Sequence, residues 1–158
     1  MIFLQAWYSL LLLAHLLATF LLVGIMTHHL RCVGGYLRGR FGRETIELRY
    51  LRVTWWTYLA VYVLGTLAYP AFGACIRRPV LDPQFPWATG LFEVKEHWSA
   101  LALAMLTACV LLRRRFLPSQ EKDKLFLYVP LIVLVNLIVW YKIVVGSYVT
   151  LLKGTVGP

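Results

Sequence analysis

The sequence predicts an all-α integral membrane protein, a bundle of four helices with both termini on the outer side of the membrane. Of its 158 residues, 60% are hydrophobic and only 15% are charged, and the mean hydropathy is +0.70. Soluble domains are about 45–50% apolar and about 25% charged, so this composition excludes a soluble globule. It also excludes a disordered chain, which would have few aromatic residues and many charges.

Four stretches are long and apolar enough to span a membrane. A helix crosses the hydrocarbon core, about 30 Å thick, with about 20 apolar residues. The first stretch is predicted to be a retained span, because no basic residue precedes it and no small-residue cleavage site follows it. The predicted spans form a single membrane domain over residues 1–158 and lie at about residues 2–26, 53–71, 91–112 and 125–152.

The positive charges predict the orientation of the bundle. The first and third connections contain eleven Lys and Arg residues, whereas the second connection and the tail contain three. Because Lys and Arg concentrate in cytoplasmic loops, connections one and three are predicted to be cytoplasmic and both termini to lie outside. We therefore interpret the net charge of +9 as a topology signal with contacts to anionic lipid, and expect no nucleic-acid partner.

Glycines and prolines predict where the first and second connections depart from helical structure. Gly34-Gly35 and Gly42 are expected to break the chain in the first connection. Helical spacing resumes at Arg43, and Glu47, four residues later, can pair with it. The second connection, IRRPVLDPQFPWATG, contains three prolines and is expected not to form a continuous helix.

The histidines and cysteines near the first connection give a weak metal signal. His28 and Cys32 are four residues apart, a spacing compatible with a metal ligand pair. Without further ligands in the pattern, His28 and His29 are interpreted as polar residues at the membrane interface. The three cysteines are interpreted as small buried apolar residues.

Charged residues within the third span give the strongest functional signal. Such groups are costly at membrane depth and usually face the interior of the bundle. In LFEVKEHWSALALAMLTAC, Glu93 and His97 share a helix face that continues into three alanines at four-residue spacing, ending at Ala108. Small residues permit close helix contact. The pattern therefore predicts that Glu93 and His97 point inward and that Lys95 faces elsewhere.

Other spans offer partners for these groups. The first span contains His15 near its middle, and the fourth contains Asn136 and Lys142. Counted from the outer ends at about 1.5 Å per residue, His97 lies roughly 9 Å deep, Lys142 roughly 15 Å and His15 roughly 20 Å. Residues from three helices are thus expected between the outer surface and just past the midplane.

Haem b is one cofactor that this arrangement favours. It needs one or two histidine ligands from facing helices, and cations near the surface for its propionates. We expect His15 and His97 to be the axial ligands and Glu93 to lie beside them. The cations expected to meet the propionates are Lys142, Arg77 and Arg78.

Two other interpretations account for the same residues. In the first, Glu93, Glu96, His97 and Lys142 form a proton or ion relay. In the second, the charged residues form a buried salt-bridge cluster that only fixes the register of the helices.

The sequence also resembles a known family. HLLATFLLVGIMTHH, from His15, resembles the first helix of four-helix bacterial membrane proteins related to the copper-resistance D protein and to the HemJ-type protoporphyrinogen oxidase. LFEVKEHW resembles the W-L-H-x-K segment of the HemJ type, and VPLIVLVNLIVWYK resembles its closing helix. The resemblance implies that His15 is a haem ligand and that Lys95 matches the lysine of that segment. In place of the HemJ histidine, two residues before the lysine, this chain has Glu93.

The expected function is that of a small multi-pass protein of the bacterial inner membrane. It binds haem b, or serves as an accessory subunit of a membrane electron-transfer complex. We do not expect it to be an enzyme by itself, although the resemblance allows a protoporphyrinogen-oxidase-like activity. The alternatives are a structural subunit of a larger membrane complex or homo-oligomer, and a component of proton or small-solute transport.

Overall fold

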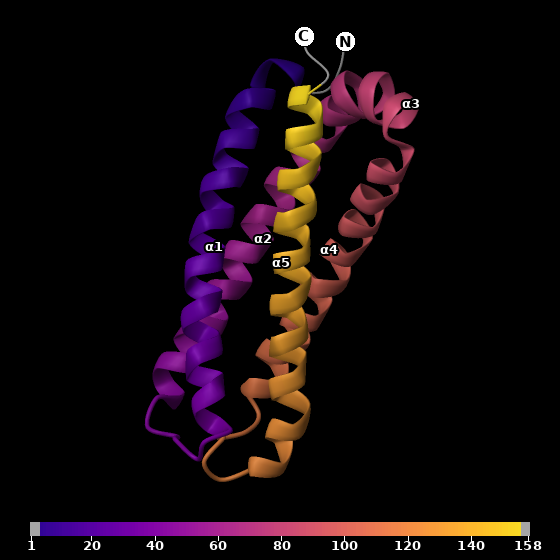
Figure 1. Cartoon of the computed structure of the whole chain (residues 1–158). Helices are drawn as coiled ribbons and strands as arrows, with labels where there is room; N and C mark the ends of the chain where they lie inside the picture. The colour runs from indigo at the N-terminus through magenta and orange to yellow at the C-terminus, as the bar shows by residue number, and fades with distance from the viewer. Residues whose placement is uncertain (1–3, 156–158) are drawn as a thin grey trace.

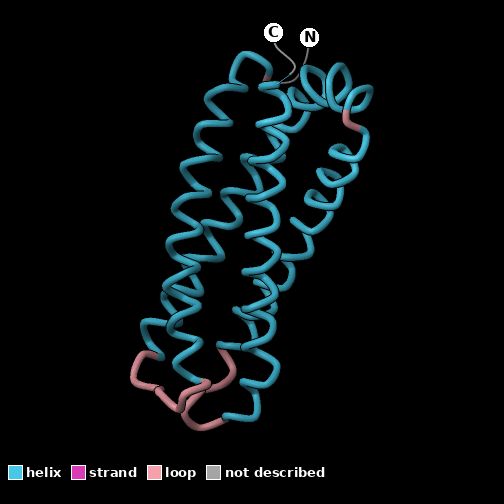
Figure 2. The backbone as a smooth tube through the Cα atoms, viewed as in Figure 1, coloured by secondary structure: helices cyan, strands magenta, loops and turns pink. Residues whose placement is uncertain are grey.

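The computed structural model describes residues 4–155, apart from the side chains of Lys153 and Thr155. Its described residues are helical with short connections, and they contain no strand. The four long helices form one bundle, with the chain ends at one end and the first and third connections at the other (Figures 1 and 2). These are called the terminal end and the loop end below. The helices are α1 (Tyr8–Tyr36), α2 (Glu44–Phe72), α4 (Pro86–Arg113) and α5 (Leu125–Thr155).

This architecture confirms the predicted all-α bundle of four helices. All four helices are long and apolar enough to cross a membrane. At 28 to 31 residues each, they are roughly 42–46 Å long, which exceeds the hydrocarbon core of a bilayer. The start of the first predicted span, at residues 2 and 3, lies outside the described residues.

The connection at the terminal end is more helical than its prolines predict. After α2 the chain continues as a π-helix, η2 (Gly73–Leu81), and then as the short α3 (Asp82–Gln84). The expectation that the connection is not a continuous helix was confirmed, but the interruption is short because two of the prolines occupy places that a helix tolerates. Two of the prolines lie in the first turns of α3 and α4. A backbone N–H in the first turn of a helix makes no hydrogen bond within the helix, so a proline, which lacks this N–H, costs nothing there. The chain leaves helical geometry only at Phe85, with φ −137° and ψ 60°.

At the loop end, α1 runs further than predicted. It passes through Gly34-Gly35 and ends at Tyr36, so the expected break at these glycines was wrong. The turn comes at Gly39, whose φ of +69° favours glycine. The backbone N–H groups of Gly39 and Arg40 donate to the carbonyls of Tyr36 and Gly35. Two acidic residues in the first turn of α2 then favour the start of that helix.

The bundle packs as two helix pairs. Helix α1 packs mainly against α2, and α4 against α5. One buried apolar cluster contains residues from all four helices, including Leu22, Tyr58, Leu106 and Val135. Many large apolar residues face outward, as in a bundle whose surface contacts lipid. Polar residues that lie between these apolar helices are therefore the candidates for a functional site.

Candidate functional site

A polar cluster lies between the helices in the half of the bundle nearer the terminal end. The hydroxyl of Tyr58, a fully buried residue of α2, donates to the carbonyl of Ser99 on α4 over 3.0 Å. The ammonium of Lys142 on α5 donates to the same hydroxyl over 3.1 Å. One tyrosine therefore connects α2, α4 and α5 inside the bundle.

Two further charges from α4 join this cluster. Lys95 and Glu96 form an ion pair at 3.0 Å, and the Lys95 side chain is 15% exposed. Both residues are close enough to Lys142 to interact with it electrostatically. The cluster therefore holds two ammonium groups and one carboxylate, which leaves an excess of one positive charge.

His15 adds a residue from α1. Its Nδ1 lies 3.0 Å from the backbone carbonyl oxygen of Val61 on α2. Because a carbonyl only accepts, Nδ1 carries the proton and the Nε2 of the neutral ring keeps a free lone pair. Lys95, Glu96 and Lys142 all interact electrostatically with His15. We call these five residues, His15, Tyr58, Lys95, Glu96 and Lys142, the intramembrane cluster.

Gly65 allows His15 to approach α2 closely. A Cβ atom at position 65 would lie 3.2 Å from Cε1 of His15 and 3.5 Å from its Nδ1. The first distance is tighter than ordinary van der Waals contact, so any larger residue would push the ring away. The glycine and the Val61 carbonyl together fix the position of the imidazole.

The predicted inward face of α4 was wrong. His97 and Glu93 are exposed, and so are the three alanines Ala100, Ala104 and Ala108. Nδ1 of His97 bonds to the carbonyl of Glu93 on its own helix, at 2.8 Å, and to no other residue in the described part of the chain. The face that packs inside the bundle instead contains Ser99, Ala102, Leu106, Cys109 and Arg113. Lys95 precedes this face by one turn, so it points inward where it was expected to face elsewhere.

The two predicted propionate cations also lie elsewhere. Arg77 forms an ion pair with Glu93 and another with Asp82, and it donates to the Tyr69 hydroxyl over 2.8 Å. Its charge is thus engaged at the terminal end. Arg78 is exposed on the π-helix. Of the predicted site residues, His15 and Lys142 come together inside the bundle, whereas His97, Arg77, Arg78 and Glu93 do not join them.

A second polar cluster lies at the loop end and was not predicted. Its centre is Glu47 of α2, which is fully buried. Glu47 accepts hydrogen bonds from His29, Tyr36, Arg113 and Tyr128. These donors come from α1, α4 and α5, so this carboxylate connects all four long helices. We call these five residues the loop-end network.

The geometry of the loop-end network is that of a satisfied structural cluster. Nε of Arg113 lies 2.7 Å from Oε2 of Glu47, and Nε2 of His29 lies 3.0 Å from Oε1. Arg113 also donates to the carbonyls of Phe116 and Glu44. A buried carboxylate with this many donors is stable where it is and has little capacity left for a ligand.

Two sequence-based interpretations of the loop-end residues change as a result. Glu47 pairs with Arg113 and not with Arg43, and His29 is buried instead of interfacial. His28 is exposed and its ring stacks on Tyr50 of α2. The sequence did carry a signal for Glu47. Counting back along α2 from buried Tyr58 through Thr54 and Leu51 places residue 47 on the same face.

Within residues 4–155, no group of three or more His, Cys, Asp or Glu side chains is placed to hold a metal ion. Two surface cavities, lined by residues of α1, α2, α4 and the α4–α5 connection, lie toward the loop end. Cys32 and Cys109 are buried as expected, whereas Cys75 is exposed.

Comparisons with protein families, curated proteins and solved structures find no match.

Proposed function

We propose that this chain is a small multi-pass membrane protein that binds haem b at the intramembrane cluster and serves as an accessory subunit in electron transfer. The observation that carries the proposal is the geometry of His15. Its Nδ1–H is bound to the Val61 carbonyl, so the free lone pair of Nε2 is available to a ligand. Histidines that bind metals commonly have their other nitrogen fixed in this way.

The residues around His15 fit a haem with one histidine ligand from this chain. His15 would ligate the iron, and the absence of a side chain at Gly65 lets its ring lie close against α2. Lys142 and Lys95 would attract the propionates. A bound haem would supply one-electron transfer. His97 does not fit as the second axial ligand, because it faces out of the bundle.

The excess positive charge of the cluster favours a ligand that carries a carboxylate. This argument does not depend on iron ligation by His15. Lys95 has Glu96 as its ion-pair partner, whereas the direct partner of Lys142 is the neutral Tyr58 hydroxyl. A charge at membrane depth is costly unless an opposite charge compensates it. A carboxylate-bearing ligand would supply that compensation.

The proposal includes an orientation. The loop end contains most of the arginines and lysines, so it lies in the cytoplasm and the termini lie outside, in a bacterial inner membrane. In this orientation the intramembrane cluster lies in the outer half of the bilayer.

The test is a visible absorption spectrum of the protein, purified in mild detergent after expression with ample haem precursor. We expect a Soret band in the oxidised protein and sharp α and β bands after reduction with dithionite. Membranes from cells that lack the gene, treated in the same way, are the control. A colourless protein, or a colour equal to that of the control, contradicts the proposal.

One observation favours a second candidate function, assembly with another membrane protein. The exposed face of α4 carries His97 in line with Ala100, Ala104 and Ala108. A histidine facing lipid is costly, and small residues allow another helix to approach closely. We propose a second copy of this chain as the occupant, because the same small-residue face on each copy would let two α4 helices pack closely against each other.

Disulfide cross-linking tests this second candidate. With Cys75 replaced by alanine, Ala104→Cys should give a cross-linked dimer in oxidised membranes. The control is Leu13→Cys, on the exposed face of α1, which should remain monomeric. If Ala104→Cys stays monomeric or both variants cross-link equally, this candidate is wrong.

A further inference from the structure

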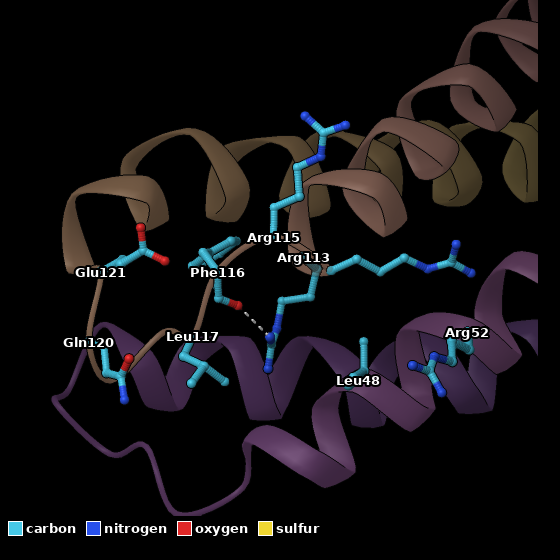
Figure 3. Close-up of a pocket in the computed structure, with 9 residues that line it drawn as sticks. Leu48, Arg52, Arg113, Arg115, Phe116, Leu117, Gln120 and Glu121 are labelled. Carbon is cyan, nitrogen blue, oxygen red and sulfur yellow. Dashed lines mark hydrogen bonds between the residues drawn. The ribbon is translucent and has the colours of Figure 1, made fainter.

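We infer that an arginine-lined pocket at the loop end binds the phosphate group of an anionic phospholipid. The pocket has a volume of about 440 Å³ and lies where α2 meets the end of α4 and the chain that follows it (Figure 3). Its lining combines four arginines with apolar side chains. The lining residues are Leu48, Arg52, Arg113, Arg114, Arg115, Phe116, Leu117, Gln120 and Glu121.

The pocket has more positive charge than its own acid can neutralise. Arg52, Arg114 and Arg115 are exposed and form no ion pair within the described part of the chain. The single acid of the lining, Glu121, is paired with Lys124. Guanidinium groups bind phosphate through two parallel hydrogen bonds and stay charged at any physiological pH. The chemistry of the pocket therefore selects a phosphate.

The walls of the pocket are held in place. Arg113 is buried, and its guanidinium bonds to Glu47 on α2 and to the Phe116 carbonyl, the latter shown as a dashed line in Figure 3. The backbone N–H of Ser119 donates to the Glu44 carboxylate over 2.6 Å. These bonds fix the α4–α5 connection against α2. Arg113 thus belongs to the frame, and the neighbouring arginines are free for a ligand.

The apolar part of the lining favours a lipid over a soluble phosphate compound. Leu48 and Leu117 lie beside the arginines, and Leu117 is 46% exposed. The pocket is at the end of the helices, where the headgroups lie if the chain spans a membrane. A phospholipid would place its phosphate on the arginines and its first acyl carbons against the leucines. This inference does not depend on haem binding.

Arg52 and Arg114 are the residues to test, because Figure 3 shows Arg115 pointing away from Arg113. The detergent-solubilised full chain is titrated with three probes, namely dioctanoyl phosphatidylglycerol, dioctanoyl phosphatidylcholine and inorganic phosphate. Binding is followed by microscale thermophoresis, and one-to-one stoichiometry is checked by native mass spectrometry. We expect phosphatidylglycerol to bind at least tenfold more tightly than either other probe.

The variant Arg52→Gln/Arg114→Gln should weaken phosphatidylglycerol binding at least tenfold. Its matched control is Arg38→Gln/Arg40→Gln, which removes the same charge from the first connection, where both arginines are exposed. Arg52→Lys is a milder variant that keeps the charge but loses the two parallel hydrogen bonds, and it should weaken binding severalfold. Each variant is used after its helical circular dichroism matches that of the parent.

Three outcomes would overturn the inference. Equal loss of binding in both double variants would show a general charge effect, not a pocket. Equal binding of inorganic phosphate and phosphatidylglycerol would assign the pocket to soluble phosphates. Unchanged binding in Arg52→Gln/Arg114→Gln would place any lipid site elsewhere.

Discussion

Glu47 illustrates at the residue scale how one buried charge organises this bundle. Its carboxylate is fully buried and accepts bonds from α1, α4 and α5 while lying on α2. Arg113 supplies the opposite charge, so the pair is neutral overall. Breaking such a pair from one side leaves a charge buried without compensation, and this costs much more than the pair contributes to stability.

Replacing Glu47 by glutamine should therefore destabilise the protein strongly. The change keeps the shape of the side chain and leaves the Arg113 charge buried. We expect a loss of about 3–5 kcal/mol in the free energy of unfolding, measured by thermal or denaturant unfolding in detergent.

The matched control is Arg43→Gln, which removes an exposed charge four residues earlier. It should change the free energy of unfolding by no more than about 0.5 kcal/mol. Equal stabilities for Glu47→Gln and the parent would show that the loop-end network does not hold the helices together.

Gly65 provides a second residue-scale prediction, at the intramembrane cluster. In Gly65→Ala the added methyl group would lie 3.2 Å from the His15 ring, so the ring must move away from the Val61 carbonyl. We expect the Soret band to shift or weaken in this variant. The control is Gly24→Ala, whose Cβ would meet nothing within 4 Å, and it should keep the parent spectrum. Identical spectra for both variants would mean that His15 is not close to the haem that we propose.

At the scale of the element, the rotation of α4 about its axis decides which residues belong to the site. Its buried residues follow one another at spacings of three and four from Ser99 to Arg113. This rotation brings Lys95 and Ser99 into the bundle and turns His97 outward. In water the apolar face of a helix reveals its buried side, but in a membrane both sides are apolar. The rotation of α4 could therefore not be predicted from hydropathy.

Two alanines, two residues apart, test this rotation. Ala102 is fully buried, whereas Ala104 is exposed. Ala102→Leu should destabilise the bundle by about 1–3 kcal/mol, because extra atoms in a packed core force side chains to shift. Ala104→Leu should leave the stability of the monomer nearly unchanged. If Ala104→Leu unfolds at a lower temperature than Ala102→Leu, α4 has the rotation that the sequence predicted, with Ala104 facing the interior of the bundle.

For the whole molecule, the sequence predicted what depends on the length and hydropathy of its segments, namely the number of long helices. The four apolar stretches became four helices, and the termini lie together at one end (Figure 1). Contacts between helices were less predictable. The link from Glu47 to Arg113 spans 66 residues, and no local pattern specifies which partner a buried carboxylate will have. Within the candidate site, His15 and Lys142 were found by sequence because they interrupt apolar spans, whereas Tyr58 gave no such signal.

The orientation of the molecule is tested by cysteine labelling in intact cells. In a Cys75→Ala background, Gln84→Cys, at the terminal end, should react with a membrane-impermeant maleimide. Arg38→Cys, at the loop end, should react only after the inner membrane is permeabilised. Both positions are exposed, so the side of the membrane determines their reaction. The reverse pattern would place the arginine-rich connections outside.

The measurement that tests the central claim most directly compares two histidine variants. His15→Gly removes the inward histidine and His97→Gly removes the outward one. We expect His97→Gly to keep the haem spectrum of the parent. His15→Gly should lose it, and added imidazole should restore it by occupying the space of the missing ring. If His15→Gly keeps the parent spectrum, or His97→Gly loses it, the haem site that we propose at His15 is wrong.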